Sequence, residues 1–109
     1  MKKEHIVKEN RDFSAIIETG ACIKDKNLVI YYKDNKLNKA RFGISVGTKV
    51  GKAHIRNKLK RQIRNIVDNY KNSYSKSKDY IIIVRKACLE CTFEEIEASY
   101  QKLFEKIKD

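Results

Sequence analysis

The chain has 109 residues and carries 25 Lys and Arg against 14 Asp and Glu, a formal net charge of +11. This length predicts a single domain over residues 1–109 with one modest core. A hydrophobic content of 41% excludes an intrinsically disordered chain. The excess of positive charge predicts a polyanionic partner.

The sequence also indicates where the protein works. No segment reaches the roughly 18 consecutive apolar residues of a membrane span, and the start, Met1 to Ile6, lacks the apolar region of a signal peptide. The three cysteines are an odd number, which favours a reducing compartment over secretion. We therefore expect a cytoplasmic protein.

The chain begins with a predicted short helix. Phe13, Ile16 and Ile17 fall at helical spacing, so that one side of this segment is apolar. Gly20 follows as a typical C-terminal stop. These signals predict a helix over residues 11–19.

Two strands are expected next. Residues 28–32 form a compact apolar and aromatic run, and residues 42–46 alternate apolar side chains with glycine and serine. The short polar link between them predicts that the two strands pair antiparallel. The second strand shows only Gly43, Ser45 and Gly47 on its other face, which is expected to be flat and open to a bulky ligand.

The second half of the chain predicts two longer helices and one strand. Apolar residues recur at three- and four-residue intervals from Ile55 to Tyr70, as in an amphipathic helix. An apolar strand is expected over residues 80–84, and Thr92 and Glu95 form a capping box before a last helix. The order α-β-β-α-β-α predicts an α+β fold, a two-layer α-β sandwich whose helices cover one face of a small sheet.

The positive charge is concentrated in one segment. Between Asn35 and Val67 there is no Asp or Glu, whereas the other 76 residues hold 15 basic and 14 acidic side chains. The ten basic residues of the segment are Lys36, Lys39, Arg41, Lys49, Lys52, Arg56, Lys58, Lys60, Arg61 and Arg64. A charge run is often only a solvated helix face. Because solvated faces usually mix both signs, this segment instead predicts a surface that binds RNA or DNA.

The basic helix and the loop before it both favour phosphate. Arg56, Lys60 and Arg64 form an i, i+4, i+8 ridge, roughly opposite the apolar stripe, and their mutual repulsion destabilises the helix unless an anion neutralises it. The loop from Val46 to Ala53 contains two glycines and two lysines, and its backbone amides are suited to phosphate. It does not match a Walker A loop, which requires Ser or Thr where Ala53 stands. Nucleotide hydrolysis is therefore not expected.

The 24 residues from Arg41 to Arg64, RFGISVGTKVGKAHIRNKLKRQIR, resemble the RNR-motif region of the protein subunit of bacterial ribonuclease P. Similar flanking segments at residues 10–13, 29–31 and 79–86 extend the resemblance over most of the chain. In that family a catalytic RNA removes the 5′ leader of precursor tRNA by Mg²⁺-dependent hydrolysis, and the protein is an accessory subunit without catalytic residues. The resemblance implies a left-handed β-α-β crossover around the basic helix, where general rules predict a right-handed one.

The resemblance also implies two RNA-binding sites. The ribonuclease P RNA is expected to bind a face that consists of Lys49, Lys52, Arg56, Asn57, Lys58, Lys60, Arg61 and Arg64. The single-stranded leader of precursor tRNA is expected in a cleft lined by Phe13, Ile17 and Tyr31, in which aromatic rings stack on bases. Three residues depart from the family pattern: Lys58 replaces an arginine, Thr48 a common lysine, and Ile17 a common aromatic residue. Neither DNA nor a membrane is an expected partner.

No catalytic or metal site is expected in the protein itself. Cys88 and Cys91 form a lone Cys-x2-Cys pair, which only Cys22, His5 or His54 could complete as a zinc site. His54 has no recognisable nucleophile or acid as a partner. Metal-assisted hydrolysis requires acidic ligands, which the basic segment lacks, so Mg²⁺ is expected to be held mainly by the RNA and the substrate.

Two other classes of protein share some of these features. A ribosome-associated, nucleoid or other structured-RNA-binding module would carry the same cationic helix without stimulating cleavage. A membrane-surface protein is disfavoured, because the apolar stripe of the basic helix is needed for the core and is not free to enter lipid. Stimulation of cleavage by a catalytic RNA distinguishes these alternatives.

Overall fold

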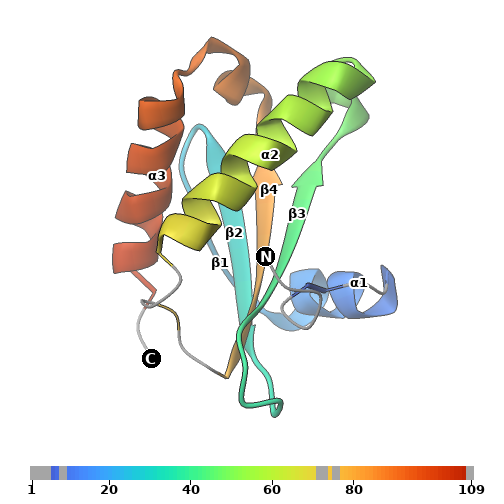
Figure 1. The fold of residues 1–109 in the computed structure, drawn as a ribbon. Helices are drawn as coiled ribbons and strands as arrows, with labels where there is room; N and C mark the ends of the chain where they lie inside the picture. The colour runs from blue at the N-terminus through green and yellow to red at the C-terminus, as the bar shows by residue number, and fades with distance from the viewer. Residues whose placement is uncertain (1–5, 8–9, 71–73, 75–76, 108–109) are drawn as a thin grey trace.

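The computed structural model describes residues 6–7, 10–70, 74 and 77–107. In chain order they form α1 (Asn10–Thr19), β1 (Ala21–Lys24), β2 (Leu28–Asp34), β3 (Arg41–Val46), the 3-10 helix η2 (Thr48–Val50), α2 (Ala53–Asn69), β4 (Lys78–Val84), the 3-10 helix η3 (Lys86–Glu90) and α3 (Phe93–Glu105) (Figure 1). The predicted α+β sandwich is confirmed. The predicted order lacked β1, a four-residue strand in which only Ile23 is partly buried.

The sheet has the strand order β1-β2-β4-β3. Strand β2 pairs antiparallel with β1 and with β4, and β3 pairs parallel with β4. The predicted antiparallel pairing of β2 with β3 is therefore wrong. Strand β4 takes the place between them because Tyr80, Ile81 and Ile82 are buried in succession, which requires cover on both faces of the sheet.

The connection from β3 through α2 to β4 is left-handed. In Figure 1 both strands point upward, α2 crosses in front of the sheet, and β4 lies to the left of β3. A chain that rises along β3, descends in front and rises again on the left turns in the left-handed sense. This uncommon handedness agrees with the family resemblance.

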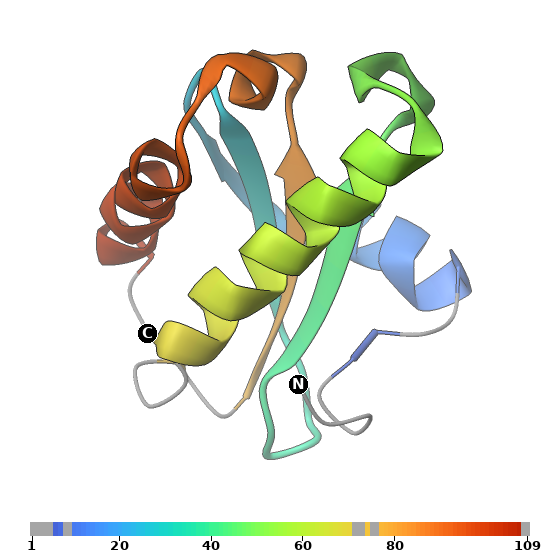
Figure 2. The ribbon, with the colours of Figure 1, turned by 45° about the horizontal axis from the view of Figure 1, so that its top comes forward.

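The main core lies between the sheet and helices α2 and α3. It contains Leu28 and Ile30 of β2, Ile82 of β4, Ile63 of α2 and Leu103 of α3, each with 0% exposure. Helix α1 packs on the opposite face, where Ile16 joins the fully buried Ile81 (Figure 2). The expectation that all helices cover one face is therefore wrong for α1, because β4 is apolar on both of its faces.

Local signals set the ends of two helices as predicted. The hydroxyl of Thr92 accepts from the amide of Glu95 at 3.2 Å, and the Glu95 carboxylate accepts from the amide of Thr92 at 2.9 Å, which is the predicted capping box. Gly20 ends α1, and a Cβ there would lie 2.5 Å from the carbonyl oxygen of Ile16 and 2.7 Å from that of Tyr32. Only glycine fits at this crossing of two backbone segments.

Candidate nucleic-acid interface

One side of α2 packs on the sheet and the other carries positive charge. Leu59, Ile63, Ile66 and Val67 are its buried residues. The predicted RNA-binding residues Asn57, Lys58, Arg61 and Arg64 are exposed, whereas Arg56 and Lys60 are half-buried. The helix therefore presents a continuous cationic face.

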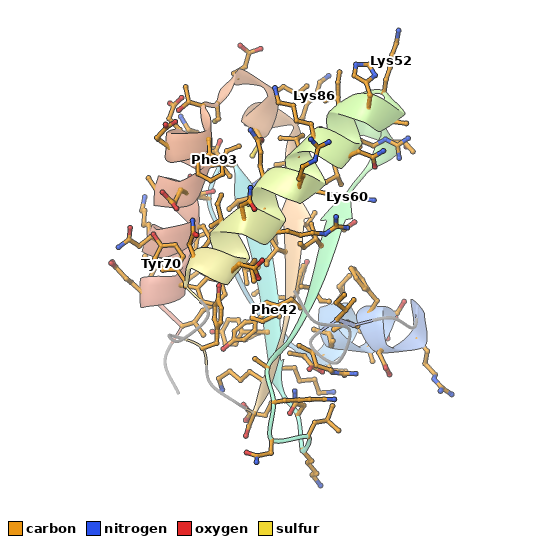
Figure 3. The ribbon with its side chains drawn as sticks, in the orientation of Figure 1. Phe42, Lys52, Lys60, Tyr70, Lys86 and Phe93 are labelled. Atoms are coloured by element: carbon orange, nitrogen blue, oxygen red, sulfur yellow. The ribbon has the colours of Figure 1, made fainter. Side chains whose placement is uncertain are left out.

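The sequence predicted the ridge of Arg56, Lys60 and Arg64 roughly opposite the apolar stripe, and this prediction is wrong. Arg56 precedes the buried Ile63 by seven residues, which is two turns, and Lys60 precedes it by three. Both residues therefore border the packed side, and Figure 3 shows Lys60 on the side of α2 toward β3. The ridge follows the edge of the contact between α2 and the sheet.

The loop that precedes α2 adds two lysines to this face. Lys49 and Lys52 are exposed, while Val50 between them is anchored in the core with 6% exposure. Lys52 is the N-cap of α2 and makes no side-chain capping hydrogen bond, and the first turn holds no acidic residue. The positive end of the helix dipole is therefore not neutralised locally, and it reinforces the lysines as a site for phosphate.

Arg41, in contrast, is neutralised within the protein. Its Nε and Nη2 donate to the two carboxylate oxygens of Asp79 at 2.8 and 2.7 Å, and Nη1 lies 3.7 Å from Asp12 of α1. The hydrogen bond to Asp79 raises the pKa of Arg41. This bidentate pair joins β3 to β4, so the charge of Arg41 serves the fold rather than the cationic face.

A second surface lies on the opposite face of the sheet. The strand register aligns two rows of side chains across the four strands, first Cys22, Tyr31, Ile81 and Gly43, and then Lys24, Val29, Ile83 and Ser45. Helix α1 covers the Gly43 end of the first row. The sequence predicted that this face of β3 is open along its whole length, and this is wrong at Gly43. Phe13 fills the space there, because a Cβ at Gly43 would meet Phe13 Cε2 at 2.5 Å.

The structure brings the predicted cleft residues together. Phe13, Ile17 and Tyr31 pack in one cluster with Ile16 and Ile81. Beside this cluster is an open hollow of about 430 Å³, lined by Cys22, Lys24, Val29, Tyr31, Gly47, Val50, Ile83, Val84, Arg85 and Lys86. Tyr31 and Ile83 belong both to this cluster and to the hollow, whereas Phe13 and Ile17 belong to the cluster and do not line the hollow.

Three basic residues at the hollow were not predicted as site residues. Lys24, Arg85 and Lys86 are exposed, and Arg85 is held in place because its Nη1 donates to the carbonyl oxygen of Asp25 at 2.9 Å. The Arg-Lys pair directly after the strand at 80–84 was the signal available in the sequence. The position of Arg85 and Lys86 at the hollow depends on β1 and on the strand order, neither of which the sequence predicted.

The cationic face and the hollow meet at the η2 loop. Gly47 and Val50 line the hollow, Lys49 and Lys52 extend the cationic face, and η2 contacts η3, which begins at Lys86. Figure 3 shows Lys52 and Lys86 at the same end of the molecule. A nucleic acid on α2 and a second strand in the hollow would therefore lie side by side at this end.

The cysteine pair has structural contacts. The Cys88 thiol donates to the carbonyl oxygen of Asn27 at 3.2 Å, and the Cys91 thiol donates to Asn27 Oδ1 at 3.4 Å. Asn27 is 4% exposed and donates to Ser99 Oγ at 2.8 Å. Burial raises the pKa of Cys88 to about 11. No three His, Cys, Asp or Glu side chains gather as a metal site in the part of the chain that the structure describes.

A small α+β domain with a cationic helix, a lysine-bearing loop and an adjoining hollow with a basic rim is a nucleic-acid-binding protein. The Ribonuclease P family model matches residues 1–108, and the chain belongs to this family. It is a protein subunit of ribonuclease P, the ribonucleoprotein of tRNA processing, and its partner is the ribonuclease P RNA. No helix within the described residues is long and apolar enough to cross a membrane.

Relatives and solved structures match along nearly the whole chain. The ribonuclease P protein component of Mycoplasma capricolum subsp. capricolum is 45% identical over 109 residues, which cover 99% of this chain and 100% of the relative. That of Bacillus cereus strain B4264 is 36% identical, over 97% of this chain and 93% of the relative. The Staphylococcus aureus RNase P protein superposes with a TM-score of 0.86 at 34% identity, covering 93% of each chain. The Thermotoga maritima protein gives a TM-score of 0.86 at 31% identity, covering 94% of this chain and 97% of the other.

Proposed function

We propose that this subunit holds the ribonuclease P RNA on the cationic face of α2 and the 5′ leader of precursor tRNA in the hollow beside α1. It thereby assists the RNA in removing the leader, in the bacterial cytoplasm where tRNA precursors are made. The observation that carries this proposal is the junction of two chemically different surfaces at the η2 loop. One surface is suited to phosphates and the other to unpaired bases.

The cationic face is suited to a structured RNA. Arg61 and Arg64 are exposed and present planar guanidinium groups that fit phosphate oxygens in a bidentate manner. Asn57, also exposed, offers a donor and an acceptor to a 2′-hydroxyl or a base edge. Each neutralised phosphate releases condensed counterions, so this binding should weaken steeply with salt.

The hollow is suited to a single strand. Its floor includes Tyr31, Val29 and Ile83, all half-buried, which offer apolar surface to an unstacked base. Lys24 and Arg85 at its rim are exposed and can follow the phosphates of the strand. Bases in a duplex face each other and cannot reach this floor, so the hollow favours the unpaired leader.

The hydrolytic chemistry is assigned to the RNA. Mg²⁺ prefers oxygen ligands, above all carboxylates and phosphates, and residues 35–67, which include the cationic face, contain no Asp or Glu. The residues of this face do not fit a Mg²⁺ site. The protein contributes binding and charge neutralisation, while the RNA and the substrate hold the metal ions.

Two sets of variants test the proposal on ribonuclease P RNA assembled with the protein. Tyr31→Ala, and Phe13→Ala through its packing in the cluster with Tyr31, should weaken the binding of precursor tRNA by about 1 kcal/mol, the lower end of a base–aromatic contact, and should leave mature tRNA unaffected because it has no leader. Replacing Arg56, Lys60 and Arg64 together with Ala should weaken binding of the ribonuclease P RNA and flatten its dependence on salt.

The thermal stability of each variant serves as the control. Equal losses for precursor and mature tRNA, together with a large fall in melting temperature, would assign Phe13 and Tyr31 to the core alone. An unchanged salt dependence in the triple variant would remove the ridge from the RNA-binding face. Tight RNA binding without any stimulation of cleavage would identify a structured-RNA-binding module instead.

A further inference from the structure

Arg56 differs from the other arginines of the cationic face. Its side chain is half-buried, and Nε donates a hydrogen bond to the carbonyl oxygen of Gly51 at 3.1 Å. Arg61 and Arg64 are exposed and make no side-chain hydrogen bond or ion pair within the described residues. Arg56 therefore already has a partner inside the protein, and this partner belongs to the loop that carries Lys49 and Lys52.

We propose that Arg56 is a positioning residue, which fixes the loop 47–52 so that Lys49 and Lys52 are presented to the RNA. This inference rests on the proposed function, since it concerns how the same face is assembled. It assigns Arg56 a role beyond its charge, because a loop fixed before binding loses less conformational entropy when the RNA arrives.

The loop requires such a restraint because it contains a glycine near each end. A Cβ at Gly47 would meet nothing within 4 Å, so that no neighbour confines this residue from the side. Gly51 is fully extended, with φ 165° and ψ −172°. Glycine loses more conformational freedom on ordering than any other residue, so both ends of the loop are costly to fix.

Several contacts fix the loop within the described residues. Val50 is buried at 6% exposure, and its amide donates to the carbonyl oxygen of Gly47 at 3.0 Å. These contacts restrain the first half of the loop. In the second half, the carbonyl oxygen of Lys52 accepts from the amides of Ile55 and Arg56 at 3.0 Å, and the side-chain hydrogen bond from Arg56 adds a restraint on Gly51.

An arginine can restrain the loop and still bind phosphate. A guanidinium has five N–H donors in a rigid plane, and the bond to Gly51 uses one of them. The other four make no hydrogen bond within the described residues. A lysine keeps the charge but has a single ammonium on a flexible stem, so Arg56→Lys separates the positioning role from the charge.

The decisive experiment compares Arg56→Lys with the matched variant Arg61→Lys. In the free protein, Arg56→Lys should shift the backbone amide resonances of residues 47–52, and Arg61→Lys should not. In binding to a bacterial ribonuclease P RNA, Arg56→Lys should lose roughly five- to tenfold in affinity, as for the loss of one hydrogen bond of ordinary strength. The slope of affinity against salt should stay the same because the charge is kept.

A double-mutant cycle with Lys49→Gln provides a second readout. If Arg56 acts through the loop, the losses of Arg56→Lys and Lys49→Gln should be less than additive, whereas those of Arg61→Lys and Lys49→Gln should add. Unchanged loop resonances in Arg56→Lys, or additive losses in both cycles, would overturn the inference. Failure of the wild-type protein to bind the RNA would instead refute the proposed function, and the two failures are therefore distinguishable.

Discussion

Replacing Gly43 with alanine should push Phe13 away from the sheet and destabilise the protein. The new methyl group would lie 2.5 Å from Phe13 Cε2 and 2.8 Å from Ile81 Cδ1, well inside the roughly 3.5–4.0 Å of a normal carbon contact. Ile81 is 0% exposed and has no room to move, whereas Phe13 is half-buried and can be displaced outward. Overpacking of this kind costs about 1–3 kcal/mol.

Removing the ring of Phe13 should relieve the closer of these two contacts. Phe13→Ala alone should cost less than the about 3–5 kcal/mol of a fully buried Phe, because Phe13 is only half-buried. In the double variant the methyl group at position 43 occupies the freed space. The double variant should therefore lose less stability than the sum of the two single losses, while the contact with Ile81 Cδ1 at 2.8 Å keeps it below Phe13→Ala alone.

Urea unfolding followed by circular dichroism measures these free energies. Gly47→Ala is the matched control, because a Cβ there meets nothing within 4 Å and the backbone, at φ −69° and ψ 158°, suits alanine. This variant should be unchanged or stabilised by up to about 1 kcal/mol. If the losses at positions 13 and 43 simply added, Phe13 would not cover Gly43, and the packing of α1 on this part of the sheet would be incorrect.

Three further outcomes follow from individual contacts. Asp79→Asn should cost about 3–5 kcal/mol in urea unfolding, because Asp79 is 5% exposed and its loss of charge leaves Arg41 without its bidentate partner; a cost below about 1 kcal/mol would contradict this. The hydrogen bonds from Thr92 lower the pKa of Glu95, so this carboxylate stabilises the fold above its usual pKa, and the effect is lost as the pH falls through the lowered value. Glu95→Gln should therefore lose less stability than wild type on acidification, and equal losses would argue against the capping box. Cys88, whose pKa is raised to about 11, should resist alkylation at about pH 8 until the protein unfolds, while the exposed Cys22 reacts at once, as labelling with mass spectrometry would show.

Local patterns predicted much of the fold. The apolar spacing from Ile55 to Tyr70 predicted α2, which runs from Ala53 to Asn69, and the Thr92–Glu95 capping box predicted the start of α3. Both signals depend on neighbouring residues only. The charge of the segment 35–67 likewise predicted the cationic face, whereas the pairing of Arg41 with Asp79 depends on a residue far along the chain.

Features that depend on long-range pairing were not predicted. Strand β1 is short and mostly exposed, so its sequence lacks the apolar alternation of a strand. The antiparallel pairing of β2 with β3 was wrong because the apolar β4, far along the chain, lies between them. The contributions of Lys24, Arg85 and Lys86 to the hollow depend on this strand order.

The partial burial of Arg56 was also not predicted from the sequence. A helical ridge can be counted from residue spacing, but the width of the packed side of α2 depends on how the helix crosses the sheet. Ile63 and Val67 extend that side toward Arg56 and Lys60. The hydrogen bond to Gly51 follows from this position and from the path of the preceding loop.

The decisive measurement for the proposed function is the cleavage of a precursor tRNA by a bacterial ribonuclease P RNA at low Mg²⁺, with and without this protein. The protein should accelerate cleavage at Mg²⁺ concentrations at which the RNA alone is slow, because the cationic face reduces repulsion between phosphates and the hollow holds the leader. Rigorously RNA-free protein should cleave nothing. Absence of stimulation, or Mg²⁺-dependent cleavage by the RNA-free protein, would contradict the division of labour between protein and RNA.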